Sequence, residues 1–318
     1  MSGRDGGGCL TAMAVVLGIA VVALGAALLY LVLAGDVSSS RQGEPQRQEL
    51  VAKAFSEYTW DELAQVADLI GSAETDDAAR EVAASYNLSV GDVRPLPLDN
   101  GITAQLTIVG IYHDERTDGA GKAGLTLMTS PIALRAMSSS GTSAGGWESS
   151  ELRAWLAGEG TDLLPDELAS AIVPVSKLTN NVGVTADVAS VTQTSDALWL
   201  FSASEVCGQV SWFTDEYGTE PNAHTGYVDF KRYDALLSAE GEQYEYFSGA
   251  GVTATSDPGN VLALPYGGST VAWWYRTAYP YSFTGEDASY FYQVMASGYP
   301  GTTGLASEPA GIVVGLCL

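Results

Sequence analysis

One uninterrupted apolar run near the N-terminus constrains this chain more than any other sequence feature. The run begins at Leu10, ends at Ala34, and contains neither a charged residue nor a proline. At about 1.5 Å per residue, a helix of this length exceeds the roughly 30 Å hydrocarbon core of a bilayer. The sequence therefore predicts a single transmembrane helix at residues 10–34, with the membrane as one partner of the chain.

Two other interpretations of the N-terminus remain open. A cleaved signal peptide would need a shorter apolar run and a small-x-small site after it, and only weak sites follow Leu33. A pilin-type junction at Cys9 would require glutamate five residues into the mature chain, where Met13 stands. Because the flanking charges nearly balance, orientation depends on the short N-terminal tail, which we expect to stay inside the cell.

The charge of the chain narrows its possible partners. It has 38 acidic residues against 14 basic ones and a formal net charge of −24, so its surface repels phosphate backbones and nucleic acid is excluded as a partner. Hydrophobic residues make up 46% of the 318 residues, which is enough to build a core. Charged residues make up only 16%, so Ser, Thr, Asn, Gly and Tyr must complete the surface, as is typical of displayed or secreted domains.

Composition shifts along the chain predict its organisation. We expect a cytoplasmic tail at residues 1–9, the membrane helix at 10–34, a polar tether at 35–48, a helical pair at 49–90 and a globular extracytoplasmic domain at 91–318. In the helical pair, Thr59 and Glu62 form a capping-box pattern, and Thr75 can cap a second helix. This pair is predicted to be a stalk or a brace against the main domain.

The globular region alternates strand and helix patterns and predicts an α+β domain, rich in loops, with mainly antiparallel strands. Strands are expected at residues 105–112, 124–128, 173–178, 197–201, 271–275, 290–295 and 311–318. Helices are expected at residues 151–156 and 165–172, the second with proline at its first position. The run at 311–318 is apolar on both faces, as expected for a strand in the centre of a sheet.

Four ordered motifs carry a resemblance to a known family. They are GGWESSELRAWL at residues 145–156, LWLFSASEV at 198–206, WWYR at 273–276 and LCL at 316–318. The chain resembles the bacterial domain-of-unknown-function family six-two-seven-three, whose members are often anchored to or displayed on the cell surface. The resemblance covers most of the region beyond the membrane and implies no activity.

The closing motifs are also distantly similar to C-type-lectin-like and formylglycine-generating folds. Val313 and Val314 stand where such folds would carry arginine and proline, so a function that needs that arginine is not implied. Formylglycine generation relies on cysteine chemistry, and Cys317 lies in an apolar strand where a thiolate is disfavoured. Cys207 and Cys317 either form one bridge or remain free buried thiols.

No pattern in the chain amounts to an enzyme active site. The GTSAG sequence at residues 141–145 matches a nucleophile elbow, but no strand precedes it, so we expect a flexible loop. The two histidines, His113 and His224, both lie in loops and cannot supply a hydrolytic triad or a histidine-rich metal site. We therefore predict a protein that is not an enzyme, with no catalytic residue, metal or cofactor.

A calcium-dependent lectin is a weaker alternative. The Glu220-Pro221-Asn222 tripeptide resembles the one that such lectins use to bind calcium and sugar, but its Trp-Asn-Asp partner is missing. Too few oxygens then converge for the six to eight ligands, roughly, that calcium takes. The loop that contains Asp114 and Asp118 also lacks alternating oxygen ligands, and we expect it to be a solvated hairpin loop.

Aromatic residues in glycine-rich connections are the remaining candidates for ligand contact, because an aromatic face can stack on a sugar or anchor a protein. The predicted ligand-binding residues are Trp212, Tyr217, Glu220, Asn222, Tyr227, Arg276, Tyr279 and Tyr281, with Asp229 and Asp287 as further hydrogen-bonding groups. The sequence thus predicts a binding or adhesion module, anchored in the cell membrane, for a glycan or protein ligand on the cell exterior. A structural cell-envelope component without a ligand is the alternative.

Overall fold

The fold is described from a computed structural model, which defines residues 50–257, 259–282 and 288–318. The predicted tail, membrane helix and tether lie outside these residues, as does Asp287, so they stay predictions. Residues 50–318 form one compact unit. Within the described ranges, no helix combines the length and the apolar character needed to cross a membrane.

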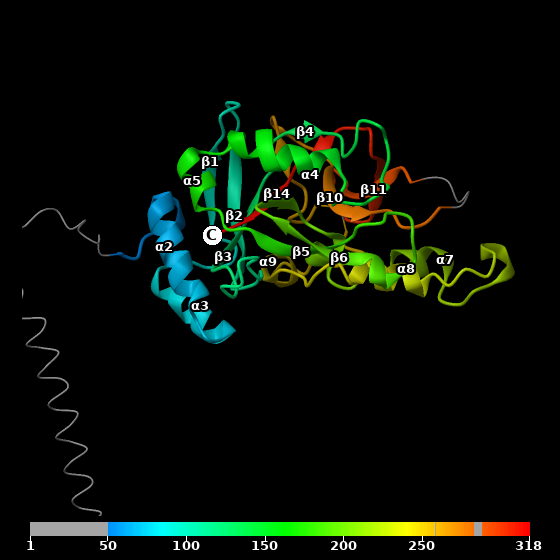
Figure 1. Cartoon of the computed structure of the whole chain (residues 1–318), viewed down its shortest axis with the longest axis horizontal. Coiled ribbons are helices and arrows are strands. Elements are labelled where there is room, and N and C mark those ends of the chain that lie inside the picture. The colour runs from blue at the N-terminus through cyan, green and yellow to red at the C-terminus, as the bar shows by residue number, and fades with distance from the viewer. Residues whose placement is uncertain (1–49, 258, 283–287) are drawn as a thin grey trace, which may run out of the picture. The chain divides into compact units, whose positions relative to one another are not determined.

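Short helices surround the strands of this unit (Figure 1). The α-helices are α2 (Trp60–Gly71), α3 (Asp76–Ser85), α4 (Glu151–Trp155), α5 (Asp166–Ala171), α6 (Ala203–Cys207), α7 (Trp212–Tyr217), α8 (Lys231–Ser238) and α9 (Glu245–Gly249). Shorter helical turns are η1 (Phe55–Glu57), η2 (Leu156–Gly160), η3 (Thr161–Leu163), η4 (Val188–Ser190) and η5 (Ala223–Thr225).

The described strands form two five-stranded sheets and two smaller pairs. The first sheet has the order β1 (Val93–Pro97), β2 (Thr103–Ile111), β3 (Leu125–Thr129), β14 (Val314–Cys317), β7 (Leu198–Leu200). The second has the order β12 (Thr302–Leu305), β11 (Tyr290–Val294), β10 (Trp273–Ala278), β13 (Ala310–Gly311), β4 (Leu134–Arg135). The pairs are β5 (Val175–Asn180) with β6 (Val191–Asp196), and β8 (Pro265–Tyr266) with β9 (Ser269–Thr270). Only β10 and β13 pair in parallel among these strands, so the fold is α+β with mainly antiparallel sheets, as predicted.

The apolar run at residues 311–318 is buried as predicted, but it is not one strand. Its first residue belongs to β13 in the second sheet, whereas β14 lies in the first sheet between β3 and β7. Between them, Ile312 packs into one hydrophobic cluster and Val313 into another. The run is apolar on both faces because it passes between two cores, and a sequence pattern does not reveal that change of sheet.

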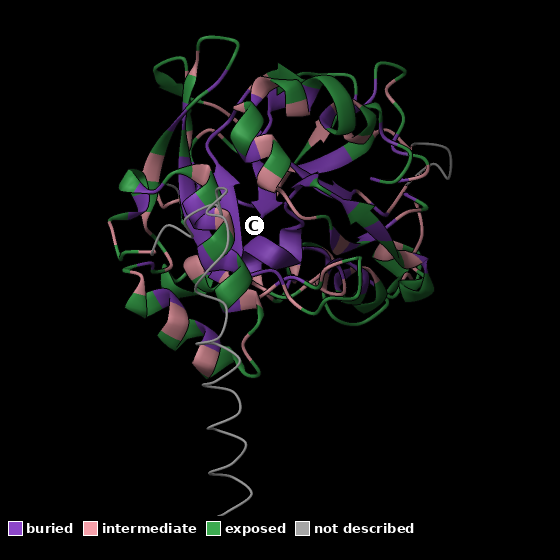
Figure 2. Ribbon diagram, turned by 60° about the vertical axis from the view of Figure 1, so that its left-hand side comes forward, coloured by how far each residue is buried: buried purple, intermediate pink, exposed green. Residues whose placement is uncertain are grey.

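The predicted helical pair forms and packs against the first sheet. Thr59 caps α2, with its Oγ1 accepting a hydrogen bond from the Glu62 N–H at 3.2 Å, while the Glu62 carboxylate accepts one from the Thr59 N–H at 2.9 Å. Leu63 and Ile70 are completely buried in the cluster that also contains the core residues of β2 and β3. The pair is therefore a brace, in contact with the sheet. Figure 2 shows many buried residues on the strands, while α2 and α3 keep exposed outer faces; α6 is buried along its whole length.

Several predicted features differ in detail. Pro165 precedes α5 as its N-cap residue and is not its first residue, contrary to the prediction. Strands β1 and β12 were not predicted from the sequence, because both lie at sheet edges, where one side of the strand has no partner and a regular apolar alternation is not required. Strand β6 was missed because its residues are mostly polar, and half of them are exposed.

The central position of β14 makes its side chains far more costly to truncate than those of an edge strand. We expect Leu316→Ala, at a completely buried residue, to lower the free energy of unfolding by about 2–5 kcal/mol. The matched control Leu305→Ala, on edge strand β12 with 37% exposure, should cost less than about 1 kcal/mol. Urea unfolding of the full-length chain measures both, and equal losses would contradict the central placement.

Candidate ligand site and buried ion network

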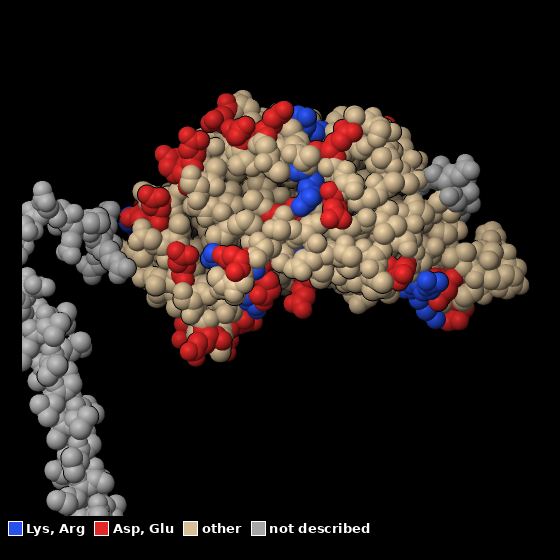
Figure 3. Space-filling model, in the orientation of Figure 1, with Lys and Arg blue, Asp and Glu red and all other residues tan. Residues whose placement is uncertain are grey.

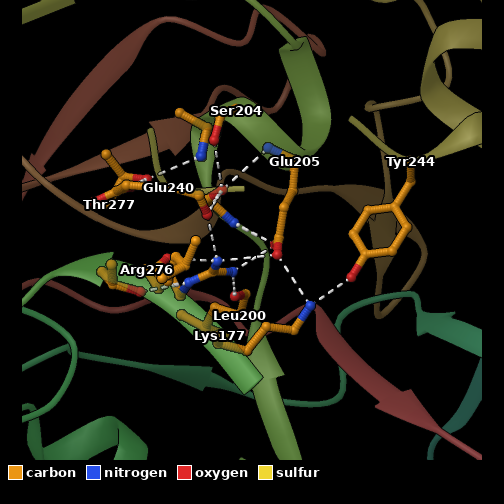
Figure 4. Close-up of polar contacts among 12 residues, drawn as sticks. Lys177, Leu200, Ser204, Glu205, Glu240, Tyr244, Arg276 and Thr277 are labelled. Carbon is orange, nitrogen blue, oxygen red and sulfur yellow. Dashed lines mark hydrogen bonds and ion pairs between the residues drawn. The ribbon is translucent and has the colours of Figure 1, made fainter. Parts of the chain in front are cut away.

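A completely buried arginine lies at the centre of the molecule. In Arg276, on β10, Nη1 lies 2.5 Å from Oε2 of Glu205 and Nη2 lies 3.0 Å from Oε1, a two-pronged ion pair (Figure 4). Its Nε donates to Thr179 Oγ1 at 2.7 Å, and the remaining contacts reach three backbone carbonyls at 2.8–2.9 Å. A buried cation is tolerated when it is paired and fully hydrogen-bonded, and here both conditions hold.

A helix cap positions the partner of this arginine. Ser202 precedes α6, and its Oγ accepts a hydrogen bond from the Glu205 N–H at 3.1 Å. The Glu205 carboxylate accepts one in return from the Ser202 N–H at 3.0 Å, which completes a capping box. One carboxylate thus fixes the start of α6 and neutralises Arg276. The LWLFSASEV and WWYR sequences meet in the core through this contact.

A second cation, Lys177 on β5, extends the network. Its Nζ lies 2.5 Å from Oδ1 of Asp114, 3.0 Å from Oε1 of Glu205 and 2.6 Å from the hydroxyl of Tyr244. The same Nζ lies 4.3 Å from the centroid of the Trp199 ring, a cation–π contact. Lys177, Asp114 and Glu205 therefore form a continuous chain of buried charges that ends at Arg276.

The position of Asp114 corrects a prediction. The loop after β2 was expected to be solvated, but Asp114 is buried, because Lys177 supplies its counter-charge in the core. The neighbouring His113 ring packs on Tyr244, with 4.2 Å between ring centroids. Asp118, by contrast, is exposed and bonds to Arg116, as expected of a loop residue.

Burial opposes the charged form of each network residue, but neighbours of opposite charge outweigh it. Burial alone would raise the pKa of the Asp114 carboxyl, and Lys177 holds that pKa well below its usual range. Despite burial, Arg276 and Lys177 lower the pKa of Glu205, while Asp114 and Glu205 raise the pKa of Lys177. These groups stay charged at neutral pH.

Glu240 behaves differently. It lies between α8 and α9, is completely buried, and accepts hydrogen bonds from the Asn180 N–H at 2.8 Å and from the Thr277 hydroxyl. Its backbone carbonyl, not its carboxylate, binds Arg276. Burial raises the pKa of Glu240 to about 7.

The raised pKa of Glu240 predicts a loss of stability as pH rises. Between about pH 4.5 and 7 the unfolded chain has released a proton that the folded chain retains, so the free energy of unfolding should fall by up to about 3 kcal/mol, at about 1.36 kcal/mol per pKa unit. Glu240→Gln should flatten this slope. Below about pH 4 both proteins should lose stability as Asp114 and Glu205 take up protons, because folding lowers the pKa of these two carboxyls. Urea unfolding at several pH values measures the slopes, and an unchanged slope in Glu240→Gln would contradict the assignment.

A separate surface hollow gathers aromatic side chains from α7 and the second sheet. This aromatic hollow, about 290 Å³ in volume, is lined by Trp212, Phe213, Glu216, Tyr217, Tyr279, Tyr292, Gly301, Thr302 and Thr303. The rings support one another: the centroids of Trp212 and Tyr292 lie 4.5 Å apart, and those of Phe213 and Tyr279 lie 5.5 Å apart. Such packing holds aromatic faces in fixed orientations.

Helix α7 is held in place by a buried carboxylate from α8. Asp234 accepts hydrogen bonds from the N–H groups of Phe213 and Thr214, both at 2.9 Å, and from the Thr214 hydroxyl at 2.6 Å. These N–H groups begin α7, where an acidic group is favoured. The Trp212 indole donates to the Ala254 carbonyl at 2.7 Å, so its one polar atom is satisfied in the core.

Close packing and burial define the chemistry of the aromatic hollow. A Cβ at Gly301 would lie 2.7 Å from Nε1 of Trp212, so glycine is needed for this close approach. Burial and the charge of Glu216 raise the pKa of Tyr279 to about 12, and burial with a hydrogen bond to Glu216 raises that of Tyr217. Both phenols therefore keep their protons at neutral pH and remain hydrogen-bonding groups beside apolar ring faces.

The structure brings some of the predicted ligand-binding residues together. Trp212, Tyr217 and Tyr279 line the aromatic hollow. Tyr281 packs edge-on against an α8 tyrosine ring, with 5.2 Å between centroids, in the adjoining aromatic cluster. Arg276 is completely buried in the ion network, so no ligand reaches it in this structure.

The other three predicted residues lie in the loop between α7 and α8. The Glu220 carboxylate pairs with Lys231 at 2.7 Å. The Asn222 side-chain oxygen caps η5 by accepting hydrogen bonds from two backbone N–H groups, at 3.0 and 3.2 Å. Tyr227 is 72% exposed. The Glu220 carboxylate and the Asn222 side-chain oxygen thus already have partners, at the start of α8 and within the loop.

Sequence reasoning did not single out Lys177, Glu205 or Glu240 as site residues. Glu205 carried a recognisable signal, because the serine and glutamate of SASE fit a capping box. Lys177 and Glu240 carried none, since a lysine in a strand and a glutamate between two helices ordinarily face solvent.

Cysteine and metal chemistry find little support in the described part of the chain. Cys207 and Cys317 are free and buried, and burial raises the pKa of Cys207 to about 12. Across residues 50–257, 259–282 and 288–318, no group of three or more His, Cys, Asp or Glu side chains could hold a metal ion.

These features define a class of protein: a mixed α+β domain with mainly antiparallel sheets, a buried ion network and an aromatic surface hollow. The family described as Domain of unknown function (DUF6273) matches residues 123–318, which is more than half of the chain. The chain therefore belongs to this family, and the resemblance inferred from its sequence is confirmed at that level. No curated protein and no solved structure matches the chain, so the likeness to C-type-lectin-like folds stays a prediction.

Proposed function

We propose that this protein is a membrane-anchored, surface-displayed binding or adhesion module without catalytic activity, and that its ligand binds in the aromatic hollow. The observation that carries the proposal is the convergence of Trp212, Tyr217 and Tyr279 on one hollow, with Glu216 beside them. Aromatic faces combined with a few hydrogen-bonding groups are a recurring arrangement of ligand sites.

The lining favours a glycan as the ligand. Ring faces stack on the apolar faces of sugars, while phenol groups, threonine hydroxyls and a carboxylate can hydrogen-bond sugar hydroxyls. Among the described residues that line the hollow, Glu216 is the one that carries a charge. Acidic side chains also gather over the end of the molecule that carries α2 and α3 (Figure 3). Both observations favour a neutral or cationic sugar over an anionic one.

Calcium is not required for this mode of binding. The carboxylate of Glu220 is paired with Lys231, and the side-chain oxygen of Asn222 caps η5. Calcium binding would have to break these contacts and still find other oxygens.

A glycan-binding screen tests the site directly. Full-length protein in detergent should bind at least one neutral or amino-sugar glycan equally well in calcium and in chelator, and Tyr217→Ala should weaken binding about tenfold, or about 1.4 kcal/mol. Tyr266→Ala, at a partly buried tyrosine on β8 that is not among the residues lining the hollow, serves as the control. Calcium-dependent binding, or loss of binding in the control alone, would contradict the assignment. No binding to any glycan or host protein would favour a structural envelope component.

Anchoring and display are tested by protease added to intact cells. The apolar run at residues 10–34 and the short tail before it predict that residues 50–318 are digested from outside. Protection of this region, with only the first residues cleaved, would show the opposite orientation.

A further inference from the structure

Backbone register places a lysine directly opposite an aspartate in the core. The segment after β2 pairs with β5 through an antiparallel bridge between Arg116 and Val175, and a backbone hydrogen bond of 2.9 Å continues this pairing at the next pair of residues. One pair farther along the same register, Asp114 faces Lys177. Their contact is therefore set by the backbone and does not depend on two flexible side chains finding each other.

The Lys177 amine and the Asp114 carboxyl group are in direct contact. Nζ of Lys177 and Oδ1 of Asp114 lie 2.5 Å apart, below the roughly 2.7–2.9 Å of a charge-assisted hydrogen bond. Because Oδ1 is bonded to Cγ, the nitrogen lies at most about one bond length farther from the carboxyl carbon. This is close to the approach from which a nucleophile attacks, when the reacting atoms are about 3–3.5 Å apart.

An amide bond between Lys177 and Asp114 would require a proton acceptor near the amine and hydrogen-bond donors near the carboxyl group. The neighbouring side chains supply both. Oε1 of Glu205 lies 3.0 Å from Nζ of Lys177, within reach to accept a proton. The Thr126 hydroxyl donates to Oδ2 of Asp114 at 2.6 Å, and the Tyr244 hydroxyl lies 3.0 Å from both carboxylate oxygens. These donors face the oxygen on which negative charge would develop during attack.

The site also excludes water. Lys177 and Asp114 are 2% and 5% exposed, and the Trp199 ring covers Nζ. The charged amine and carboxylate are tolerated here only because each has partners of opposite charge, whereas a neutral amide needs no counter-charge. A water molecule formed there leaves for bulk solvent, which favours the product.

We propose that Lys177 and Asp114 condense into an intramolecular isopeptide bond, a covalent cross-link between β5 and the segment that follows β2. The reaction needs no cofactor or oxidant and does not depend on the proposed ligand-binding function. The bond would covalently join two parts of the core that are far apart in the sequence. Such a cross-link would stabilise a domain displayed outside the cell.

The atoms and protons of this reaction balance within the five side chains named. Nζ of Lys177 first passes one proton to Oδ1 of Asp114, 2.5 Å away, which gives a neutral amine and a carboxylic acid. The amine attacks Cγ of Asp114, forming the N–C bond, while Thr126 and Tyr244 stabilise the oxyanion on Oδ2. Glu205 then takes a second proton from the nitrogen and gives it to Oδ1, which leaves as water when its bond to Cγ breaks. The amide nitrogen keeps the third proton, and Glu205 is regenerated.

Mass spectrometry of the full-length protein tests the bond. After reduction, denaturation and trypsin digestion, the peptide that ends at Arg116 should be joined to the peptide that contains Lys177, at their summed mass less one water. Trypsin should not cleave at Lys177. The exposed pair of Lys231 and Glu220, 2.7 Å apart, is an internal control and should give no cross-link. Recovery of both core peptides unlinked from the wild-type protein would overturn the proposal, whatever the variants do.

Variants then test the roles of the neighbours. Lys177→Arg should abolish the cross-linked peptide. Glu205→Gln should reduce the linked fraction strongly, and Thr126→Val, which nearly preserves side-chain volume, should slow its formation in freshly synthesised protein. A cross-linked peptide that persists in Lys177→Arg would overturn the assignment of the bond. Unchanged linkage in both Glu205→Gln and Thr126→Val would overturn the catalytic roles given to these residues.

Discussion

The pairing of Arg276 with Glu205 organises the rest of the structure. Each residue comes from a different element, and each engages further groups: Arg276 binds three backbone carbonyls, and Glu205 starts α6 and contacts Lys177. The cost of burying these charges is offset only because every contact is made at once. Strand β10, helix α6 and strand β5 therefore have one mutually consistent arrangement, and the sheets are built around it.

The aromatic hollow depends on this arrangement indirectly. Strand β10 carries Arg276 and then leads to Tyr279, while its neighbour β11 carries Tyr292. On β12, Thr303 pairs with Tyr292 in register, which brings the threonine side of the hollow into place. The hollow is thus built from α7 and from three adjacent strands of one sheet, and a site on such a support is more rigid than one built from loops alone.

A feature of this structure could be predicted from the sequence when the interaction that determines it joins residues close together in the chain. The starts of α2 and α3 were predicted correctly, because Thr59 and Thr75 act on residues only three positions away. Trp212 and Tyr217 were expected in a glycine-rich loop but lie on helix α7, and their convergence with Tyr279 on one hollow could not be read from spacing. Arg276 was mistaken for a ligand contact, because its partner Glu205 lies 71 residues away. Charge pairing over such a distance leaves no periodic trace in a sequence.

The division of the interior into two hydrophobic clusters has a consequence for local motion. Regions that share few buried contacts can open separately, as cooperative units of different stability. The helical brace and most core residues of the first sheet belong to one cluster. Helix α7 and the rings of the aromatic hollow belong to the other, which also includes Val109 of β2 and Met128 of β3. Ile312 and Val313, which are consecutive in the chain, belong one to each cluster. Amide hydrogens on this short segment should therefore exchange with solvent only when the whole unit unfolds, while those around α7 exchange through smaller openings.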